Sequence, residues 1–294
     1  MAGVSAITPF ATVSGANGTS SVSAQQDSAK VSLKKALVFG MIRDKVSLTD
    51  KFKIAREAGF DGIELNSPTD FPLSDILQAK KSAGLELPSV INKDHWSKPL
   101  SDPDQQIRQQ CIDSVIKSMH EVKELGGDTV LVVPGVVNEK VSYEQAYITS
   151  QSAIRELIPY AEKTGVQIAL ENVWNNFILS PVEAKRFIDE INHPLVGWYF
   201  DIGNVLRYGW PEHWIHTLKS RIMRLHIKEN MNSKGLREGF KVELLEGDNN
   251  WPVVMKAVRD IGHTGGWLTA EVPGGDLMHL KKIAARMDKI ISFL

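Results

Sequence analysis

Four polar residues in the second half of the chain each end a short apolar run. They are Glu171 in Gln-Ile-Ala-Leu-Glu, Asp201 in Gly-Trp-Tyr-Phe-Asp, His226 in Met-Arg-Leu-His and Glu271 in Gly-Trp-Leu-Thr-Ala-Glu. Three carboxylates and a neutral imidazole form an oxygen-rich ligand set that suits a hard or borderline divalent cation. Buried together without a cation, the carboxylates would force one another to stay protonated. The set therefore predicts one bound divalent metal, Mn²⁺ first, with Mg²⁺, Co²⁺ or Zn²⁺ as alternatives.

Each member of this set also has an ordinary explanation. A single acid just beyond a strand is commonly a solvated loop residue or a helix cap, and a lone histidine is commonly structural. The metal prediction therefore depends on a fold that brings the four residues together. In a (β/α)₈ barrel the carboxyl ends of all strands meet at one mouth, so residues far apart in sequence converge there.

The pattern after residue 36 predicts such a barrel, because short apolar strands alternate with amphipathic helical segments. The expected strands are 37–42, 62–65, 86–91, 129–133, 167–171, 197–201, 223–227 and 267–271. The expected helices are 48–58, 73–83, 104–125, 143–163, 181–191, 212–218, 251–261 and 277–294. Ser180, followed by Pro181 and Glu183, is typical of a helix start with a capping box. An open doubly wound sheet is the structural alternative, but no glycine-rich phosphate loop follows a strand.

Composition narrows the function classes. The net charge is −1, from 34 basic and 35 acidic residues, and there is no long basic run, so neither nucleic acid nor a membrane surface is an expected partner. The expected partner is a small molecule. The single cysteine, Cys111, excludes an intrachain disulfide and a cysteine-rich zinc site.

The N-terminal segment differs from the rest of the chain. Residues 2–29 contain no Lys or Arg and are rich in Ser, Thr, Ala and Gly, so we expect 1–35 to be a tail and 36–294 to be the catalytic barrel. An exported, periplasmic location follows if residues 2–24 are the remainder of a signal peptide that ends at Val22-Ser23-Ala24. A cytoplasmic location follows if Met1 is the true start.

The strand ends resemble those of a known family. Leu-Glu-Asn at 170–172, Phe-Asp-Ile-Gly-Asn at 200–204, Leu-His-Ile-Lys-Glu at 225–229 and Ala-Glu-Val at 270–272 are similar, in order, to the ligand-bearing strand ends of the xylose-isomerase-like barrel superfamily. The resemblance is greatest to the hexulose-6-phosphate isomerase and L-xylulose-5-phosphate 3-epimerase group. It implies that Glu171, Asp201, His226 and Glu271 bind the metal, and that Glu171 and Glu271 also transfer protons. It is compatible with a homodimer.

The chemistry implied is isomerisation or 3-epimerisation of a ketose or its phosphate. A Lewis acid beside the substrate stabilises the enediolate that forms when a carbon-bound proton leaves, and two glutamates can remove and return that proton. The alternatives are a keto-sugar lyase or dehydratase and a non-catalytic carbohydrate-binding barrel. The expected substrate shell consists of Glu64, His95, Trp96, Trp174, Asn204 and Lys228.

Two departures from the family pattern narrow this expectation. The endonuclease branch carries a histidine three residues after the sixth-strand Asp, where this chain has Asn204, so DNA repair is not expected. Phosphosugar members tend to have Gly-x-Gly after the seventh strand, whereas Leu245 stands at the first place here. This departure argues against phosphate recognition, for which the remaining candidates are Lys228, Arg237 and Lys241.

Overall fold

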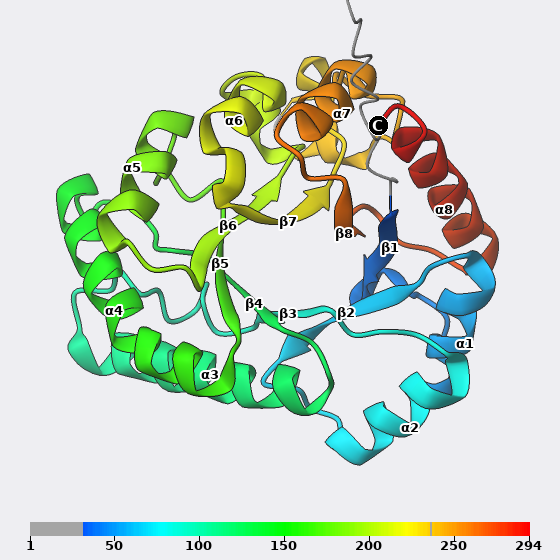
Figure 1. The fold of residues 1–294 in the computed structure, drawn as a ribbon, viewed down its shortest axis with the longest axis horizontal. Coiled ribbons are helices and arrows are strands. Elements are labelled where there is room, and N and C mark those ends of the chain that lie inside the picture. Colours follow the sequence, from blue (N-terminus) through cyan, green and yellow to red (C-terminus); the bar gives the residue numbers. More distant parts are fainter. Residues whose placement is uncertain (1–31, 236) are drawn as a thin grey trace, which may run out of the picture. The chain divides into compact units, whose positions relative to one another are not determined.

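The computed structural model describes residues 32–235 and 237–294. Within them, parallel strands close into a barrel in chain order, and the helices form a ring outside it (Figure 1). The strands are β1 (Ser32–Val38), β2 (Gly62–Ser67), β3 (Ser89–Asn92), β4 (Thr129–Val132), β5 (Gln167–Glu171), β6 (Val196–Asp201), β7 (Ile222–Ile227) and β8 (Gly265–Ala270). The α-helices are α1 (Leu48–Ala58), α2 (Leu73–Ala83), α3 (Gln105–Glu124), α4 (Tyr143–Thr164), α5 (Pro181–Ile191), α6 (Pro211–Leu218), α7 (Trp251–Asp260) and α8 (Leu277–Ile291). The expected (β/α)₈ barrel is confirmed.

The first strand lies earlier than the sequence predicts. It spans Ser32–Val38 and not 37–42, and Phe39–Met41 form a 3₁₀ turn. Lys34 and Lys35 resemble the end of a solvated tail, but Lys34 Nζ lies 2.5 Å from Glu86 and Lys35 Nζ 2.6 Å from Asp288. Pairing with β8 then continues from Ser32 to Leu37. The expected tail therefore loses residues 32–35 to β1, while 1–31 lie outside the described residues.

The third strand is shorter than expected. It spans Ser89–Asn92, and Glu86 makes only an isolated bridge to Gly62. Pro88 between them has no N–H to donate to a sheet ladder, which accounts for the break. The helix boundaries agree with the predictions to within a few residues.

The predicted capping box at the start of α5 is confirmed. In α5 the Ser180 side chain accepts a hydrogen bond from Glu183 N, and the Glu183 carboxylate accepts one from Ser180 N. Gly59 follows α1 with a φ of 99°, in the left-handed region that glycine adopts without a steric penalty. The capping box therefore fixes the start of α5, and Gly59 fixes the end of α1 before the chain enters β2.

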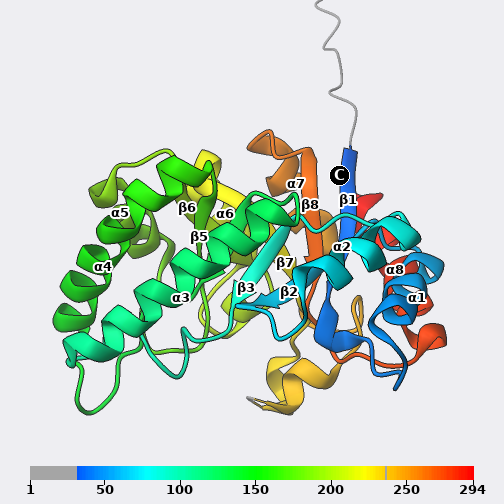
Figure 2. The ribbon, with the colours of Figure 1, turned by 90° about the horizontal axis from the view of Figure 1, so that it is seen from below.

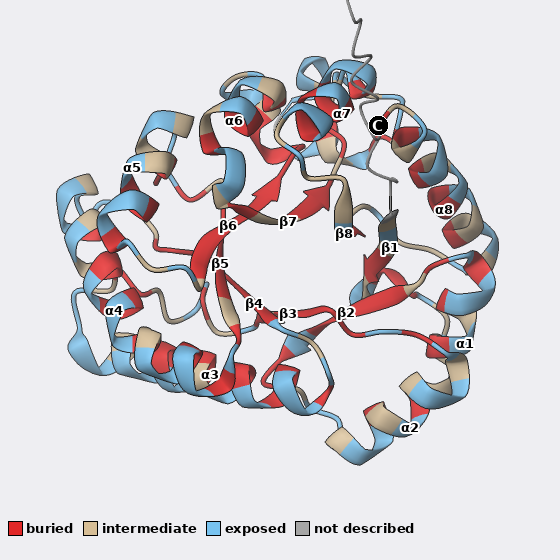
Figure 3. Ribbon diagram, viewed as in Figure 1, coloured by how far each residue is buried: buried red, intermediate tan, exposed pale blue. Residues whose placement is uncertain are grey.

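The strands separate an outer core from the barrel interior. Side chains alternate with period two, so Trp198 and Phe200 of β6 pack toward the helices while Tyr199 and Asp201 point inward. The interior holds a small apolar cluster of Leu131, Ala169 and Tyr199, with polar groups around it. Figure 3 shows the strands as mainly buried and the outer helix faces as exposed. The barrel interior is therefore packed, and polar side chains of the strands project into it.

Long connections gather at the carboxyl ends of the strands. Two 3₁₀ turns, Asn232–Lys234 and Glu238–Lys241, lie between β7 and α7. In Figure 2 this gold part of the chain projects below the strands, at the end toward which β1 runs. No described helix combines the length and apolar character needed to cross a membrane.

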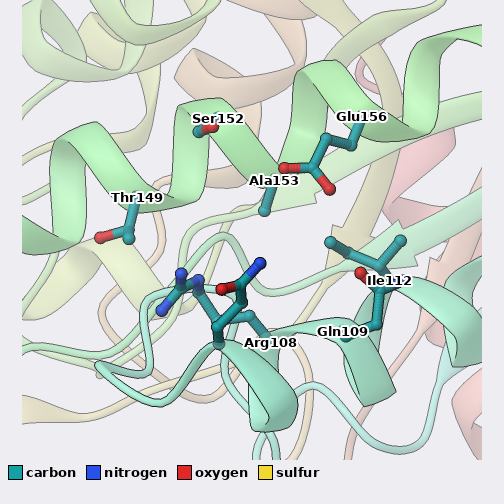
Figure 4. Close-up of a pocket in the computed structure, with 8 residues that line it drawn as sticks. Arg108, Gln109, Ile112, Thr149, Ser152, Ala153 and Glu156 are labelled. Atoms are coloured by element: carbon teal, nitrogen blue, oxygen red, sulfur yellow. The ribbon is translucent and has the colours of Figure 1, made fainter.

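A small cavity lies elsewhere, in the helix layer. It measures about 60 Å³ and lies between α3 and α4, with Arg108, Thr149 and Glu156 among its lining residues (Figure 4). Arg108 Nη1 already donates to the carbonyls of Asp102 and Pro103. The candidate chemistry therefore belongs to the strand ends and not to this cavity.

Candidate metal centre

The four predicted ligands lie together at the mouth of the barrel. Glu171 and Asp201 are the last residues of β5 and β6, His226 lies in β7, and Glu271 directly follows β8. The strand register aligns them, because Asp201 is opposite His226, and Glu271 N donates to Ile227 O at 3.0 Å. One ligand atom from each residue lies within 4.8 Å of the others. The sequence prediction that these residues converge is confirmed.

His226 occupies the centre of the cluster and is fully buried. Its Nδ1 lies 3.2 Å from Glu171 Oε1 and 3.4 Å from Glu271 Oε2. Its Nε2 lies 2.6 Å from Glu64 Oε2, on the interior side. The imidazole thus presents one nitrogen to the cluster and the other to the barrel interior.

Asp201 is held so that one carboxylate oxygen remains free of hydrogen bonds. Asn204 N donates to Asp201 Oδ1 at 2.7 Å. Asn172 binds the Asp201 backbone on both sides, accepting from its N–H and donating to its carbonyl. Oδ2 is buried and has no hydrogen-bond partner among the described residues, although Lys228 Nζ lies 3.3 Å away outside hydrogen-bond geometry. A carboxylate oxygen without a hydrogen bond, lying within a cluster of acidic groups, suits a cation.

The pKa values of Glu171 and Glu271 are shifted in opposite directions. Burial, opposed by the His226 imidazole, raises the pKa of Glu171 to about 7. Burial also opposes ionisation of Glu271, but Lys228 and His226 outweigh it and hold the pKa of Glu271 well below its usual range. Lys228 Nζ lies 2.9 Å from Glu271 Oε2. Near neutral pH, Glu171 therefore has a protonated population while Glu271 is ionised.

The donor set fits a divalent cation. Glu64, Glu171 and Glu271 lie close to His226, and Lys228 pairs with Asp201 and Glu271. Burial raises the pKa of Asp201 despite the Lys228 ammonium, so its charge also lacks full compensation. Carboxylate oxygens and one imidazole are ligands that Mn²⁺ and similar ions accept. The uncompensated negative charge and the Asp201 oxygen without a hydrogen bond both indicate a metal centre.

The remaining residues of the expected substrate shell lie at different depths. Glu64 is fully buried behind His226. His95 is buried, and its Nδ1 accepts from Val133 N at 3.2 Å; burial lowers the pKa of His95 to about 4. Trp96 is half exposed, with its ring edge-on to His95. Asn204 is buried and donates to Asn172 O. Their roles toward a substrate stay predictions.

Two aromatic rings and an arginine pack together beside the cluster. We call this group, Trp174, Phe240 and Arg207, the aromatic wall. The rings of Trp174 and Phe240 have centroids 4.6 Å apart, and Arg207 lies 4.9 Å from the Trp174 ring centroid. Lys228 Nζ lies 5.5 Å from the Phe240 centroid, which links the wall to the metal ligands. Trp174 Nε1 donates to Asn204 O. Phe240 and Arg207 were missed, because residues in irregular loops carry no periodic signal.

Glu229 is a second residue that the sequence did not reveal. Its buried carboxylate accepts from Leu245 N, Trp251 Nε1 and both the backbone and side-chain N–H of Asn249. It thereby ties the long β7–α7 connection to the end of β7. Leu245 adopts a φ of 71°, a conformation that glycine usually supplies. The backbone bend is thus present here with a leucine in place of a glycine. Lys241 pairs with Glu238 at 2.6 Å and is not free for phosphate in this arrangement.

Comparison with known proteins identifies the family of the chain. The family model described as "Xylose isomerase-like TIM barrel" matches residues 52–292. The chain belongs to this family. Its relatives within the xylose isomerase-like family include the L-ribulose-5-phosphate 3-epimerase UlaE of Salmonella typhi, 22% identical over 262 residues, which cover 82% of this chain and 90% of UlaE.

Two further similarities define the limits of the comparison. An uncharacterized protein of Methanocaldococcus jannaschii is 25% identical over 167 residues, covering 55% of this chain and only 56% of that protein. The D-psicose 3-epimerase of Clostridium cellulolyticum H10 has a similar structure, with a TM-score of 0.75 and 18% identity over 89% of this chain and 99% of that one. At this identity the structural likeness establishes the shared fold.

Proposed function

We propose that this chain is a divalent-metal-dependent sugar epimerase that inverts C3 of a ketose or ketose phosphate, with Mn²⁺ as the metal. The observation that carries the proposal is the contact of two glutamates, at the ends of β5 and β8, with the same His226 nitrogen. The relationship to UlaE, a 3-epimerase of a ketose phosphate, supports the reaction class. When bound, the metal supplies positive charge that stabilises the oxyanions of the substrate.

Glu171 and Glu271 are the proposed proton carriers. Glu271, kept ionised by Lys228 at 2.9 Å, is suited to accept the proton from the sugar carbon. Glu171 is suited to return a proton to the other face of the enediolate, because its buried carboxyl favours the protonated form more than that of Glu271 does. In the reverse direction the two exchange roles. Inversion at one carbon requires two groups of this kind, whereas elimination needs only one base to start it.

The remaining residues are proposed to hold the sugar. His95, neutral because burial lowers its pKa to about 4, can hydrogen-bond a hydroxyl without carrying charge. Trp96 and Trp174 offer aromatic faces that suit the apolar side of a sugar ring. Lys228 is close enough to Glu271 to contact the developing oxyanion.

Solvent-proton exchange tests the proposal. The Mn²⁺-loaded protein is incubated in D₂O with free ketoses, ketose phosphates and 3-keto-glycosides, and the sugars are recovered after chelation for proton NMR. We expect deuterium at C3 of a recovered ketose and of its epimer. Release of water or an aglycone, with an unsaturated product, would replace the epimerase by a lyase or dehydratase.

Two variants test the proton carriers. Glu171→Gln and Glu271→Gln are each expected to abolish exchange at C3 while the barrel remains folded by circular dichroism. Glu124→Gln, on the exposed face of α3, is the matched control and should retain exchange. Exchange at the wild-type rate in both Glu171→Gln and Glu271→Gln would disprove the two-base mechanism.

A further inference from the structure

Glu64 lies in a place that a sugar hydroxyl does not reach. Its residue exposure is 0%, and it projects from β2 into the barrel interior below the four ligands. Oε1 accepts from Ser89 Oγ at 2.5 Å and from Tyr199 OH at 2.9 Å. Oε2 faces His226 Nε2 at 2.6 Å. Both oxygens are therefore occupied by groups of the protein.

The His226 ring is fixed between two carboxylate environments. Nδ1 faces the ligands Glu171 and Glu271, and Nε2 faces Glu64. The Tyr199 ring lies against the imidazole, with centroids 4.3 Å apart, and Tyr199 also binds Glu64. A histidine that ligates a metal through one nitrogen must carry its proton on the other, and a carboxylate that accepts this proton selects the tautomer.

We propose that Glu64 is a positioning residue that accepts a hydrogen bond from His226 Nε2–H and so presents unprotonated Nδ1 to the metal. This inference rests on the proposed metal centre and gives Glu64 a different role from the sugar contact expected from the sequence. The charge of Glu64 also increases the basicity of the imidazole as a ligand. Glu64 itself is not a ligand, because the imidazole stands between it and the other three acids.

Metal affinity, measured without any sugar, tests this role. Zn²⁺ is diamagnetic and serves as the probe, with affinity taken from competition against a chromophoric chelator. Glu64→Ala should bind Zn²⁺ about 10–100-fold more weakly than the wild type, as for other carboxylates behind a ligating histidine. Glu64→Gln, which keeps an acceptor but loses the charge, should fall between the two. If Glu64→Ala does not fold, the isosteric Glu64→Gln still provides the comparison.

Tyr199→Phe is the matched control. It removes the hydrogen bond to Glu64 Oε1 but keeps the aromatic ring against His226 and the Glu64 contact with Nε2. Its Zn²⁺ affinity should therefore remain close to that of the wild type. An equal loss in Tyr199→Phe and Glu64→Gln would mean that the interior network acts only through packing, and would overturn the proposal.

A spectroscopic readout identifies the tautomer directly. Two-bond ¹H–¹⁵N correlation spectra of the Zn²⁺-loaded protein, with the His226 signals assigned by their loss in His226→Asn, should show Nε2 protonated and Nδ1 bare. Protonation at Nδ1, or unchanged Zn²⁺ affinity in Glu64→Ala together with a raised KM, would overturn the inference and restore Glu64 as a sugar ligand. Because neither binding nor tautomer depends on turnover, a failed epimerase assay leaves this test intact.

Discussion

The buried Glu171 carboxyl predicts an unusual pH dependence of stability in the metal-free protein. A carboxylate that is paired in the folded state has a lowered pKa and loses its stabilising effect only below about pH 5, whereas burial raises the pKa of Glu171 to about 7. The folded protein then binds this proton more tightly than the unfolded chain does. Its stability should therefore fall as pH rises through this window, and Asp201, whose pKa is also raised, acts in the same direction.

The magnitude follows from the two pKa values of Glu171. With an unfolded pKa of 4.5 and a folded pKa of about 7, this proton contributes about 2 kcal/mol less to the free energy of unfolding at pH 7 than at pH 5. A bound divalent metal requires the ionised carboxylate, so metal binding must release the proton. Metal affinity should consequently weaken by up to about tenfold per pH unit below pH 7.

Urea denaturation of the chelator-treated protein at pH 5, 6 and 7 measures the first effect. Glu171→Gln, which cannot titrate at this position, should lack most of the dependence while keeping the fold. The same series with saturating Mn²⁺ should show the opposite slope, because the metal selects the ionised carboxylate. A metal-free wild type whose stability is constant or rises from pH 5 to 7, or a Glu171→Gln variant with the same slope, would refute the reasoning.

Two further predictions concern residues beside the ligands. Lys228→Met removes the ammonium from Glu271 and Asp201 and should destabilise the metal-free protein by about 3–5 kcal/mol, with a much smaller loss at saturating Mn²⁺, because the metal replaces the lost charge. An equal loss with and without Mn²⁺ in urea denaturation would contradict this. Phe240→Ala removes the ring packed on Trp174 and should lower kcat/KM for the sugar by about 2–10-fold without changing Mn²⁺ affinity. A loss of Mn²⁺ affinity in a chelator titration would instead place Phe240 in support of the metal ligands.

The barrel and the four polar residues that converge at its mouth could be predicted because their signals are local. An apolar run followed by one acid or histidine identifies a strand end, and Gly59 or the Ser180 capping box identifies a helix end, each from a few neighbouring residues. The first strand was misplaced because its pairing with β8 outweighs the polar appearance of Lys34 and Lys35. That pairing partner lies more than two hundred residues away along the chain.

The groups that surround these four residues could not be predicted, because their contacts join parts of the chain that lie far apart in the sequence. The period-two rule places Lys228 on the face of His226, and the structure agrees. No rule that acts along one strand relates β2 to β7, which meet across the barrel interior and not through strand pairing. The role of Glu64 toward His226 therefore emerges only when the barrel closes. In such a fold the polar residues at the strand ends can be predicted from the sequence of each strand. The contacts that orient them form only when the whole sheet closes.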